Sequence, residues 1–189
     1  MSSTQSSQLV IFGGTGDLAL RKLQPALYKL QREGLIDDVR AIIALGRGES
    51  SDEEYRAAVK EKMREFLPPH FWDEQHWQIF SAKLHFISLD VNSLKDYHSL
   101  AEAIDRHPDS KAVFYLATAS TLYNSICRNL HSIGVVSAES RVVLEKPLGH
   151  DLASCTEINH EVLQVFPERN IFRIDHYLGK ETVQNLLVL

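Results

Sequence analysis

Two short segments in the second half of the chain concentrate charged side chains, an imidazole and a phenol. One is 145–147, Glu-Lys-Pro, which carries Lys146, and the other is 173–180, Arg-Ile-Asp-His-Tyr-Leu-Gly-Lys. Charged and hydrogen-bonding side chains of these types are suited to hold an anionic group such as a phosphate. Because the chain opens with a glycine-rich turn, the combination predicts a nucleotide site beside a phosphate-binding reaction centre.

The glycine-rich turn follows a short apolar run. The run 9–12, Leu-Val-Ile-Phe, is followed by 13–19, Gly-Gly-Thr-Gly-Asp-Leu-Ala, in which Gly14, Gly16 and Ala19 satisfy Gly-x-Gly-x-x-Gly/Ala. Glycines allow a tight turn and let the backbone approach a pyrophosphate, and the unpaired N–H groups of a following helix attract the anion. A turn that only connects strand to helix is the alternative, but the strand before it and the helix after it favour dinucleotide binding.

The end of the second apolar run indicates which dinucleotide is bound. The chain there is 45–48, Leu-Gly-Arg-Gly. An NAD enzyme places Asp or Glu here against the ribose 2′-hydroxyl, whereas the Arg47 guanidinium can hold the 2′-phosphate of NADP through paired hydrogen bonds. We therefore predict NADP, with a solvated surface arginine as the alternative. Asp90 and Val91 close the third run, where they should border the adenine, and a loop cap is the alternative for Asp90.

An alternation of strands and helices must position these segments. Short apolar runs predict six strands, at 9–12, 39–45, 84–89, 112–116, 141–144 and 170–174. Helical spacing and helix signals predict helices between them, at 17–33, from 51 to the prolines at 68–69, 94–106, 122–130 and 152–165. Pro25 should kink the first helix and Gly34 should end it. The alternation predicts the α/β class, with a Rossmann-like doubly wound parallel sheet.

The composition limits the classes of protein that fit. The 189 residues are 44% hydrophobic and 24% charged, as in ordinary globular domains. The net charge of -5 lacks the basic excess of a nucleic-acid-binding protein, and no stretch is apolar enough to span a membrane, so we expect neither partner. Cys127 and Cys155 lack Cys-x-x-Cys spacing, which favours a reducing cytoplasm, and the histidines lack the paired spacing of a metal site.

Three segments together resemble glucose-6-phosphate dehydrogenase. They are 13–19, given above, 141–152, Arg-Val-Val-Leu-Glu-Lys-Pro-Leu-Gly-His-Asp-Leu, and 173–181, Arg-Ile-Asp-His-Tyr-Leu-Gly-Lys-Glu. The last segment is the most specific, because a glycine turn or Glu-Lys-Pro alone is shared with other dehydrogenases. The resemblance runs from Leu9 to the final residue. It implies NADP-dependent oxidation of glucose 6-phosphate to 6-phosphogluconolactone, in the oxidative pentose phosphate pathway.

The resemblance also implies roles for single residues. Contacts with the coenzyme are implied for Gly13, Gly14, Thr15, Gly16, Asp17, Leu18, Arg47, Asp90, Val91, Ala117 and Lys146. Lys146 would also reach the sugar, whose phosphate would be held by His176, Tyr177 and Lys180. Asp175 would orient the catalytic histidine. The segment 118–120, Thr-Ala-Ser, departs from the prolines that many members carry near the nicotinamide, which leaves the shape of this loop open.

The catalytic histidine itself is implied downstream of 173–180, in a part of the family's sequence that this chain lacks. A general base must take the hydroxyl proton while hydride leaves C1 of the sugar. A helical pattern at 182–189 also stops at the last residue, so we expect a truncated protein that is inactive alone. The expected parts are a flexible tail at 1–8, an NADP-binding domain at 9–175 and the start of a C-terminal substrate and dimerisation domain at 176–189. The full-length protein would be a homodimer or a homotetramer.

Two alternatives to this interpretation stay open. One is a different oxidoreductase of the glucose-fructose oxidoreductase and inositol dehydrogenase group, in which Glu-Lys-Pro also follows a dinucleotide fold; the phosphate-binding run 175–180 argues against it. The other is a short, non-catalytic NADP-binding protein. The gene sequence beyond Leu189 separates the truncated enzyme from this short form.

Overall fold

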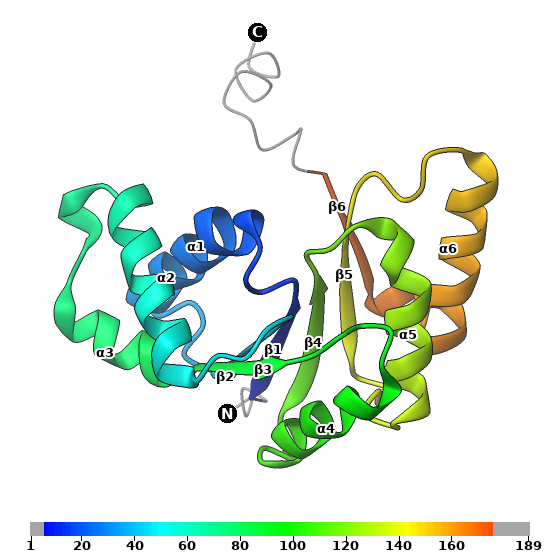
Figure 1. Cartoon of the computed structure of the whole chain (residues 1–189), viewed down its shortest axis with the longest axis horizontal. Coiled ribbons are helices and arrows are strands. Elements are labelled where there is room, and N and C mark those ends of the chain that lie inside the picture. Colours follow the sequence, from blue (N-terminus) through cyan, green and yellow to red (C-terminus); the bar gives the residue numbers. More distant parts are fainter. Residues whose placement is uncertain (1–5, 176–189) are drawn as a thin grey trace, which may run out of the picture.

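The computed structural model describes residues 6–175, which form a six-stranded parallel sheet flanked by helices (Figure 1). The strands lie in the order β3-β2-β1-β4-β5-β6. Their bounds are β1 Ser7–Phe12, β2 Val39–Gly46, β3 Leu84–Ser88, β4 Lys111–Leu116, β5 Arg141–Glu145 and β6 Ile171–Ile174. Because the chain runs outward from the central β1 first to one edge and then to the other, the sheet is doubly wound, as predicted.

Six α-helices pack on the two faces of this sheet. They are α1 Gln24–Arg32, α2 Asp52–Phe66, α3 Glu74–Ala82, α4 Tyr97–Asp105, α5 Tyr123–Ser132 and α6 Leu152–Val165. The first three share a hydrophobic core with one face, and the last three share a core with the other face (Figure 1). The central strand feeds both cores, since Ile11 points to one and Phe12 to the other, and both are fully buried. No helix within residues 6–175 is long and apolar enough to cross a membrane.

The structure corrects the start of the first strand. The sequence assigned residues 1–8 to a flexible tail, but β1 begins at Ser7 and Gln8 is fully buried. Gln8 Nε2 donates hydrogen bonds to the carbonyl oxygens of Ile104 and His107, at 3.1 and 3.0 Å. A buried amide is tolerated when backbone groups bind it, and these groups come from the end of α4, about a hundred residues away. Gln8 lies next to other polar residues in the sequence, so no apolar pattern indicated that it belongs to the strand.

The first helix and the long connection to β3 also differ from expectation. Residues 17–32 form one helical stretch, in which a π-helical segment, Ala19–Leu23, lies between the first turn and α1, so the helix is irregular directly before Pro25. Proline has no N–H to donate within a helix, and the change of hydrogen-bond pattern in the π-helical segment before it is consistent with that loss. Gly34 ends this helix as predicted, with a φ of 72°. The sequence predicted no helix at Glu74–Ala82, where the structure places α3.

Side chains of α2 occupy the open edge of the sheet at β3. An Asp52 carboxylate oxygen accepts a hydrogen bond from the backbone N–H of Phe86 at 2.7 Å. One turn later, the Arg56 guanidinium donates to the carbonyl oxygen of Leu84 at 2.8 Å. These contacts satisfy backbone groups that an edge strand otherwise presents to other chains, so this end of the sheet is protected from edge-to-edge pairing.

Candidate coenzyme site

The glycine turn after β1 lies so close to its neighbours that side chains do not fit. A Cβ atom at Gly14 would lie 2.6 Å from Cβ and 2.9 Å from Cα of Ala44 in β2. Gly13 has a φ of 77°, and a Cβ there would overlap the carbonyl oxygen of Ala117. The Gly14 N–H donates to the carbonyl oxygen of Leu45 at 2.8 Å, which holds the turn against β2. The tight turn that the glycines allow is therefore present, and approach of its backbone to a pyrophosphate stays a prediction.

A cavity of about 360 Å³ opens beside this turn, at the carboxyl ends of β1 to β4. The strand order reverses here, because β2 lies on one side of β1 and β4 lies on the other. Ligands of doubly wound sheets bind at this point. Its wall consists of Gly13, Thr15, Gly16, Leu45, Gly46, Arg47, Leu89, Asp90, Val91, Asn92, Thr118 and Leu122. Three segments predicted separately from the sequence, the turn, Arg47 and the pair at 90–91, are thus brought together.

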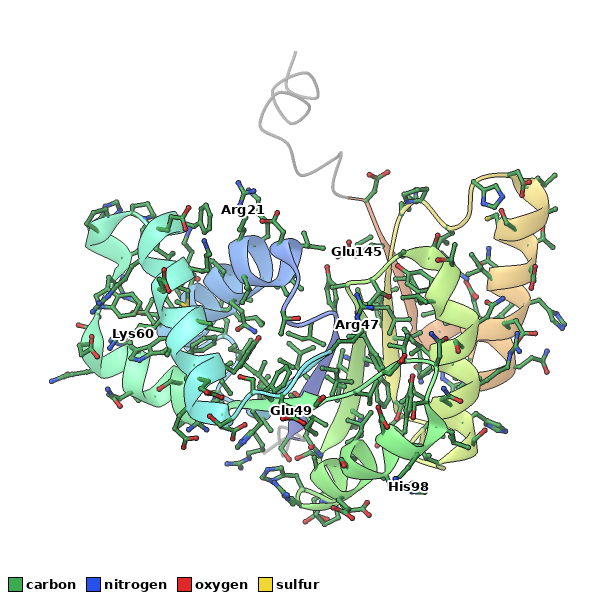
Figure 2. All side chains as sticks on the ribbon, viewed as in Figure 1. Arg21, Arg47, Glu49, Lys60, His98 and Glu145 are labelled. Atoms are coloured by element: carbon green, nitrogen blue, oxygen red, sulfur yellow. The ribbon has the colours of Figure 1, made fainter. Side chains whose placement is uncertain are left out.

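Arg47 is the cationic residue in the wall of this cavity. Its side chain is exposed and follows directly on β2, between the two groups of helices (Figure 2). The turn and the end of β2 are packed together here, since a Cβ at Gly46 would lie 2.7 Å from Thr15 Oγ1. The position matches the one predicted for binding a 2′-phosphate. It leaves the guanidinium able to meet an anion that enters the cavity.

Asp90 and Val91 lie in the same wall, and the structure shows the loop-cap role of Asp90. Its carboxylate accepts from the Asn92 N–H at 3.0 Å, and its own N–H donates to Asp96 Oδ2 at 2.9 Å. The Val91 carbonyl oxygen accepts from Tyr97 Oη at 3.1 Å and from Asn129 Nδ2 at 2.9 Å. These bonds fix the loop, while contact with adenine stays a prediction.

Lys146 and Asp175 meet at the ends of β5 and β6. Lys146 Nζ lies 3.5 Å from Asp175 Oδ2, and the Lys146 N–H donates to the Ile174 carbonyl oxygen at 3.1 Å. Both residues line a broad hollow with Pro147, which follows a cis peptide bond. The hollow is separate from the cavity that Arg47 lines. His176, Tyr177 and Lys180, predicted to bind the sugar phosphate, lie outside the described residues, so their placement is untested.

Two tyrosines that the sequence analysis did not single out join the ends of β4 and β5. Tyr115 donates to Glu145 Oε1 at 2.6 Å, and burial together with this bond raises the pKa of its phenol. The Tyr123 hydroxyl lies 3.2 Å from the Leu116 carbonyl oxygen and 3.2 Å from the Glu145 N–H. Together they fix the backbone that leads into Lys146. No short sequence pattern predicts such contacts, because Tyr123 and Glu145 are far apart in the sequence and meet only in the folded chain.

Four other residues predicted to contact the coenzyme do not line the cavity: Gly14, Asp17, Leu18 and Ala117. The Ala117 N–H donates to the Phe12 carbonyl oxygen at 3.0 Å, so the loop after β4 begins directly beside the glycine turn. Asp17 is exposed and pairs with Arg21 one turn later, at 3.2 Å. Within residues 6–175, no group of three histidine, cysteine or acidic side chains gathers as metal ligands would.

The sheet order, the glycine turn at its switch point and the cavity beside that turn define a Rossmann-type dinucleotide-binding domain. Within that class, residues 10–185 match the family described as glucose-6-phosphate dehydrogenase, NAD binding domain, and the chain belongs to this family. Binding of a nicotinamide coenzyme follows from that membership.

Relatives agree with this assignment. Glucose-6-phosphate 1-dehydrogenase of Gluconobacter oxydans is 46% identical over 187 residues, which cover 95% of this chain and 37% of the relative. The enzyme of Rhizobium meliloti is 41% identical over 180 residues, with the same two coverages. Among solved structures, the Mycobacterium avium enzyme has a TM-score of 0.84 at 32% identity, covering 95% of this chain and 38% of that one. The chain thus spans less than two fifths of the length of these relatives.

Proposed function

We propose that this chain is the NADP-binding portion of an enzyme that oxidises glucose 6-phosphate to 6-phosphogluconolactone. The observation that carries the proposal is the cavity at the switch point, which has the glycine turn on one side and Arg47 in its wall. A related structure, glucose-6-phosphate dehydrogenase in complex with glucose 6-phosphate, has a TM-score of 0.82 at 32% identity. It covers all of this chain and 40% of that one.

The choice of NADP over NAD rests on charge. The last residue of β2 and its successor are Gly46 and Arg47, so no carboxylate stands where an NAD enzyme would bind the ribose 2′-hydroxyl. A carboxylate there would repel a 2′-phosphate, whereas a guanidinium binds it through charge-assisted hydrogen bonds. The Gly14 and Gly16 N–H groups of the turn already donate to the carbonyl oxygens of Leu45 and Gly13. The N–H groups at the start of the helix after the turn are the ones suited to the pyrophosphate.

The chemistry of the reaction assigns roles to the ends of β5 and β6. The coenzyme supplies the nicotinamide that accepts hydride from C1 of the sugar. Lys146 orients the reacting hydroxyl and supports negative charge that develops on its oxygen. Asp175 holds Lys146 in this structure, and in the whole enzyme it orients the general base, a histidine that follows later in the sequence. His176, Tyr177 and Lys180 bind the sugar phosphate.

The cell compartment that fits is the cytoplasm. Cys127 and Cys155 are both free thiols, and Cys127 is fully buried. Unpaired cysteines are typical of a reducing compartment. A cytoplasmic enzyme would also meet a phosphorylated sugar, which is a charged metabolite.

The reading frame after Leu189 tests the proposal. We expect an in-frame continuation that encodes a downstream histidine, and we expect its product to form NADPH from NADP and glucose 6-phosphate, measured by absorbance. The 189-residue chain alone should form none, because it lacks the base. A stop codon directly after Leu189 would instead favour a short, non-catalytic NADP-binding protein. NADPH formation by the 189-residue chain would contradict the assignment of the base to a later part of the sequence.

A further inference from the structure

The loop after β4 carries three hydroxyl side chains with different surroundings. Ser120 Oγ accepts a hydrogen bond from the Gly149 N–H at 3.3 Å. Thr121 is exposed, so water can bind its hydroxyl. Thr118 differs from both, because its Oγ1 is buried and has no hydrogen-bond partner among residues 6–175. A hydroxyl offers one donor and two acceptor sites, and leaving them unmet in a buried place costs stability.

The position of Thr118 points to what its hydroxyl serves. Thr118 lies in the wall of the coenzyme cavity. Its Cγ2 atom lies 3.1 Å from the place where a Cβ of Gly13 would stand, so the side chain packs on the glycine turn. A buried polar group without a partner calls for an explanation, and at the wall of a binding cavity a bound ligand can supply that partner. Rotation between the staggered wells of χ1 exchanges the place of Oγ1 with that of a methyl or a hydrogen.

The order of the strands indicates which half of the coenzyme would lie beside Thr118. Arg47 follows β2 and Asp90 follows β3, so the adenosine 2′-phosphate half lies on that side of the turn. Thr118 follows β4, on the opposite side of β1. A dinucleotide whose pyrophosphate lies at the turn therefore meets Thr118 with its nicotinamide half.

We infer that Thr118 is a coenzyme-binding residue whose Oγ1 hydrogen-bonds the ribose 5′-phosphate of the nicotinamide half of NADP. The inference rests on the proposed function and adds to it a residue that discriminates one half of the coenzyme from the other. The hydroxyl stays without a partner until that half of the coenzyme is bound. Thr118 thereby adds affinity for the nicotinamide half to the affinity that Arg47 gives for the 2′-phosphate.

Three variants of the 189-residue chain test this inference by calorimetric titration. Thr118→Val removes the hydroxyl and keeps the shape, Thr118→Ser keeps the hydroxyl, and Thr121→Val is the matched control in the same loop. Each is titrated with NADP and with 2′,5′-ADP, which contains the adenosine half and no nicotinamide ribose. We expect Thr118→Val to weaken NADP binding about fivefold, the value of one hydrogen bond, and to leave 2′,5′-ADP binding unchanged. Thr118→Ser should bind NADP within about twofold of the wild type, and Thr121→Val should match it.

Melting temperatures separate a binding role from a structural one. Because the hydroxyl has no partner within the described chain, Thr118→Val should melt no lower than the wild type. The inference is overturned if Thr118→Val binds NADP as tightly as the wild type, if it weakens 2′,5′-ADP equally, or if Thr118→Ser fails to restore binding. A wild-type chain that binds neither NADP nor 2′,5′-ADP would instead contradict a coenzyme site formed by this chain alone, and with it the inference.

Discussion

Single residues at the ends of the strands are proposed to determine which coenzyme fits. Arg47 follows β2 and lines the cavity. The acidic residue that lines the cavity with it is Asp90, whose carboxylate binds the backbone of its own loop. The cation is therefore placed to meet a 2′-phosphate that NAD lacks. The glycines of the turn act differently, since they contribute by having no side chain. Both effects are measurable with single substitutions.

Replacing Arg47 should reduce the preference for NADP. We expect Arg47→Ala to weaken NADP binding by about 10- to 100-fold, because charge-assisted hydrogen bonds to the 2′-phosphate are lost, and to change NAD binding little. Calorimetric titration measures both affinities. Arg169→Ala is the matched control, because Arg169 is exposed and precedes β6 at the opposite end of the strands. Equal losses for NADP and NAD in Arg47→Ala would refute the role of Arg47 in discrimination.

Replacing Gly14 should displace the turn from β2. An alanine Cβ at 2.6 Å from Ala44 Cβ forces a backbone shift, so we expect Gly14→Ala to lower the free energy of unfolding by about 1–3 kcal/mol. NADP binding should fall more than tenfold, because the N–H groups at the start of the helix after the turn move with it.

Gly134→Ala is the control, because it adds a methyl group at a glycine where no other atom is close. Gly134 has a φ of 72° and nothing within 4 Å of a Cβ position, so only backbone strain of about 1–2 kcal/mol is expected. Its NADP affinity, measured by the same titration, should equal that of the wild type. A Gly14→Ala chain that keeps full affinity would show that the close approach to β2 is not needed for binding.

At the residue scale, the sequence predicted what has a local pattern. The glycine turn and Arg47 are recognisable because their spacing from an apolar run is fixed by the strand and turn geometry. Tyr115, Tyr123 and Thr118 have no such pattern. Their surroundings come from segments that only the folded sheet brings together, so the sequence revealed neither the contacts of the two tyrosines nor the burial of the Thr118 hydroxyl.

The secondary-structure elements are held at their ends by side chains that cap them. In α2, the Ser51 hydroxyl accepts from the Glu54 N–H at 3.2 Å, and the Glu54 carboxylate accepts from the Ser51 N–H at 2.8 Å. The sequence predicted this start, because serine followed by acidic residues is a helix signal. In α6, Asp151 is the N-cap, and its carboxylate accepts from both the hydroxyl and the N–H of Ser154.

The Asp151 cap predicts a dependence of stability on pH. Hydrogen bonds from the Ser154 hydroxyl and N–H hold the pKa of Asp151 below its ordinary value of 3.8. A lowered folded pKa gives stability that is complete above the unfolded pKa and is lost as pH falls through the folded value. We expect the difference in melting temperature between wild type and Asp151→Asn to shrink from about pH 6 to about pH 3. Asparagine keeps a capping oxygen, so helix α6 itself should remain in the variant.

The matched variant for this experiment is Asp109→Asn, which changes an exposed aspartate outside the helices by the same chemistry. The difference in melting temperature between wild type and Asp109→Asn should not show the same dependence on pH. A difference for Asp151→Asn that grows as the pH falls would contradict the sign derived from the cap.

At the element scale, the sequence predicted all six strands and five of the six helices, with shifts at their ends. Buried strands of a parallel sheet are continuous apolar runs, which makes them visible without the structure. Helix α3 escaped because it has only nine residues and turns only Trp77 and Phe80 among its large apolar side chains into the core, so its apolar stripe is too short to show a helical period. Ser7 and Gln8 escaped because a polar side chain inside β1 is acceptable only through bonds to α4.

In the whole molecule, the two candidate sites lie on the same side of the sheet, at the carboxyl ends of its strands. The cavity with Arg47 lies over β1 to β4, and Lys146 with Asp175 lies over β5 and β6. Both are at the carboxyl ends of the strands, where a dinucleotide can extend across the switch point towards the ends of β5 and β6. The alternation of strands and helices predicted this arrangement. The sugar-phosphate residues at 176–180 lie outside the described part, so the sequence is their only support.

The measurement that tests the account most directly is calorimetric titration of the 189-residue chain with NADP and, separately, with NAD. We expect saturable binding of one NADP per chain, tighter than the binding of NAD by about tenfold or more, because only NADP offers the 2′-phosphate to Arg47. Equal affinity for the two dinucleotides, or tighter binding of NAD, would contradict the assignment of NADP. Binding of neither would contradict the claim that residues 9–175 form a coenzyme site by themselves.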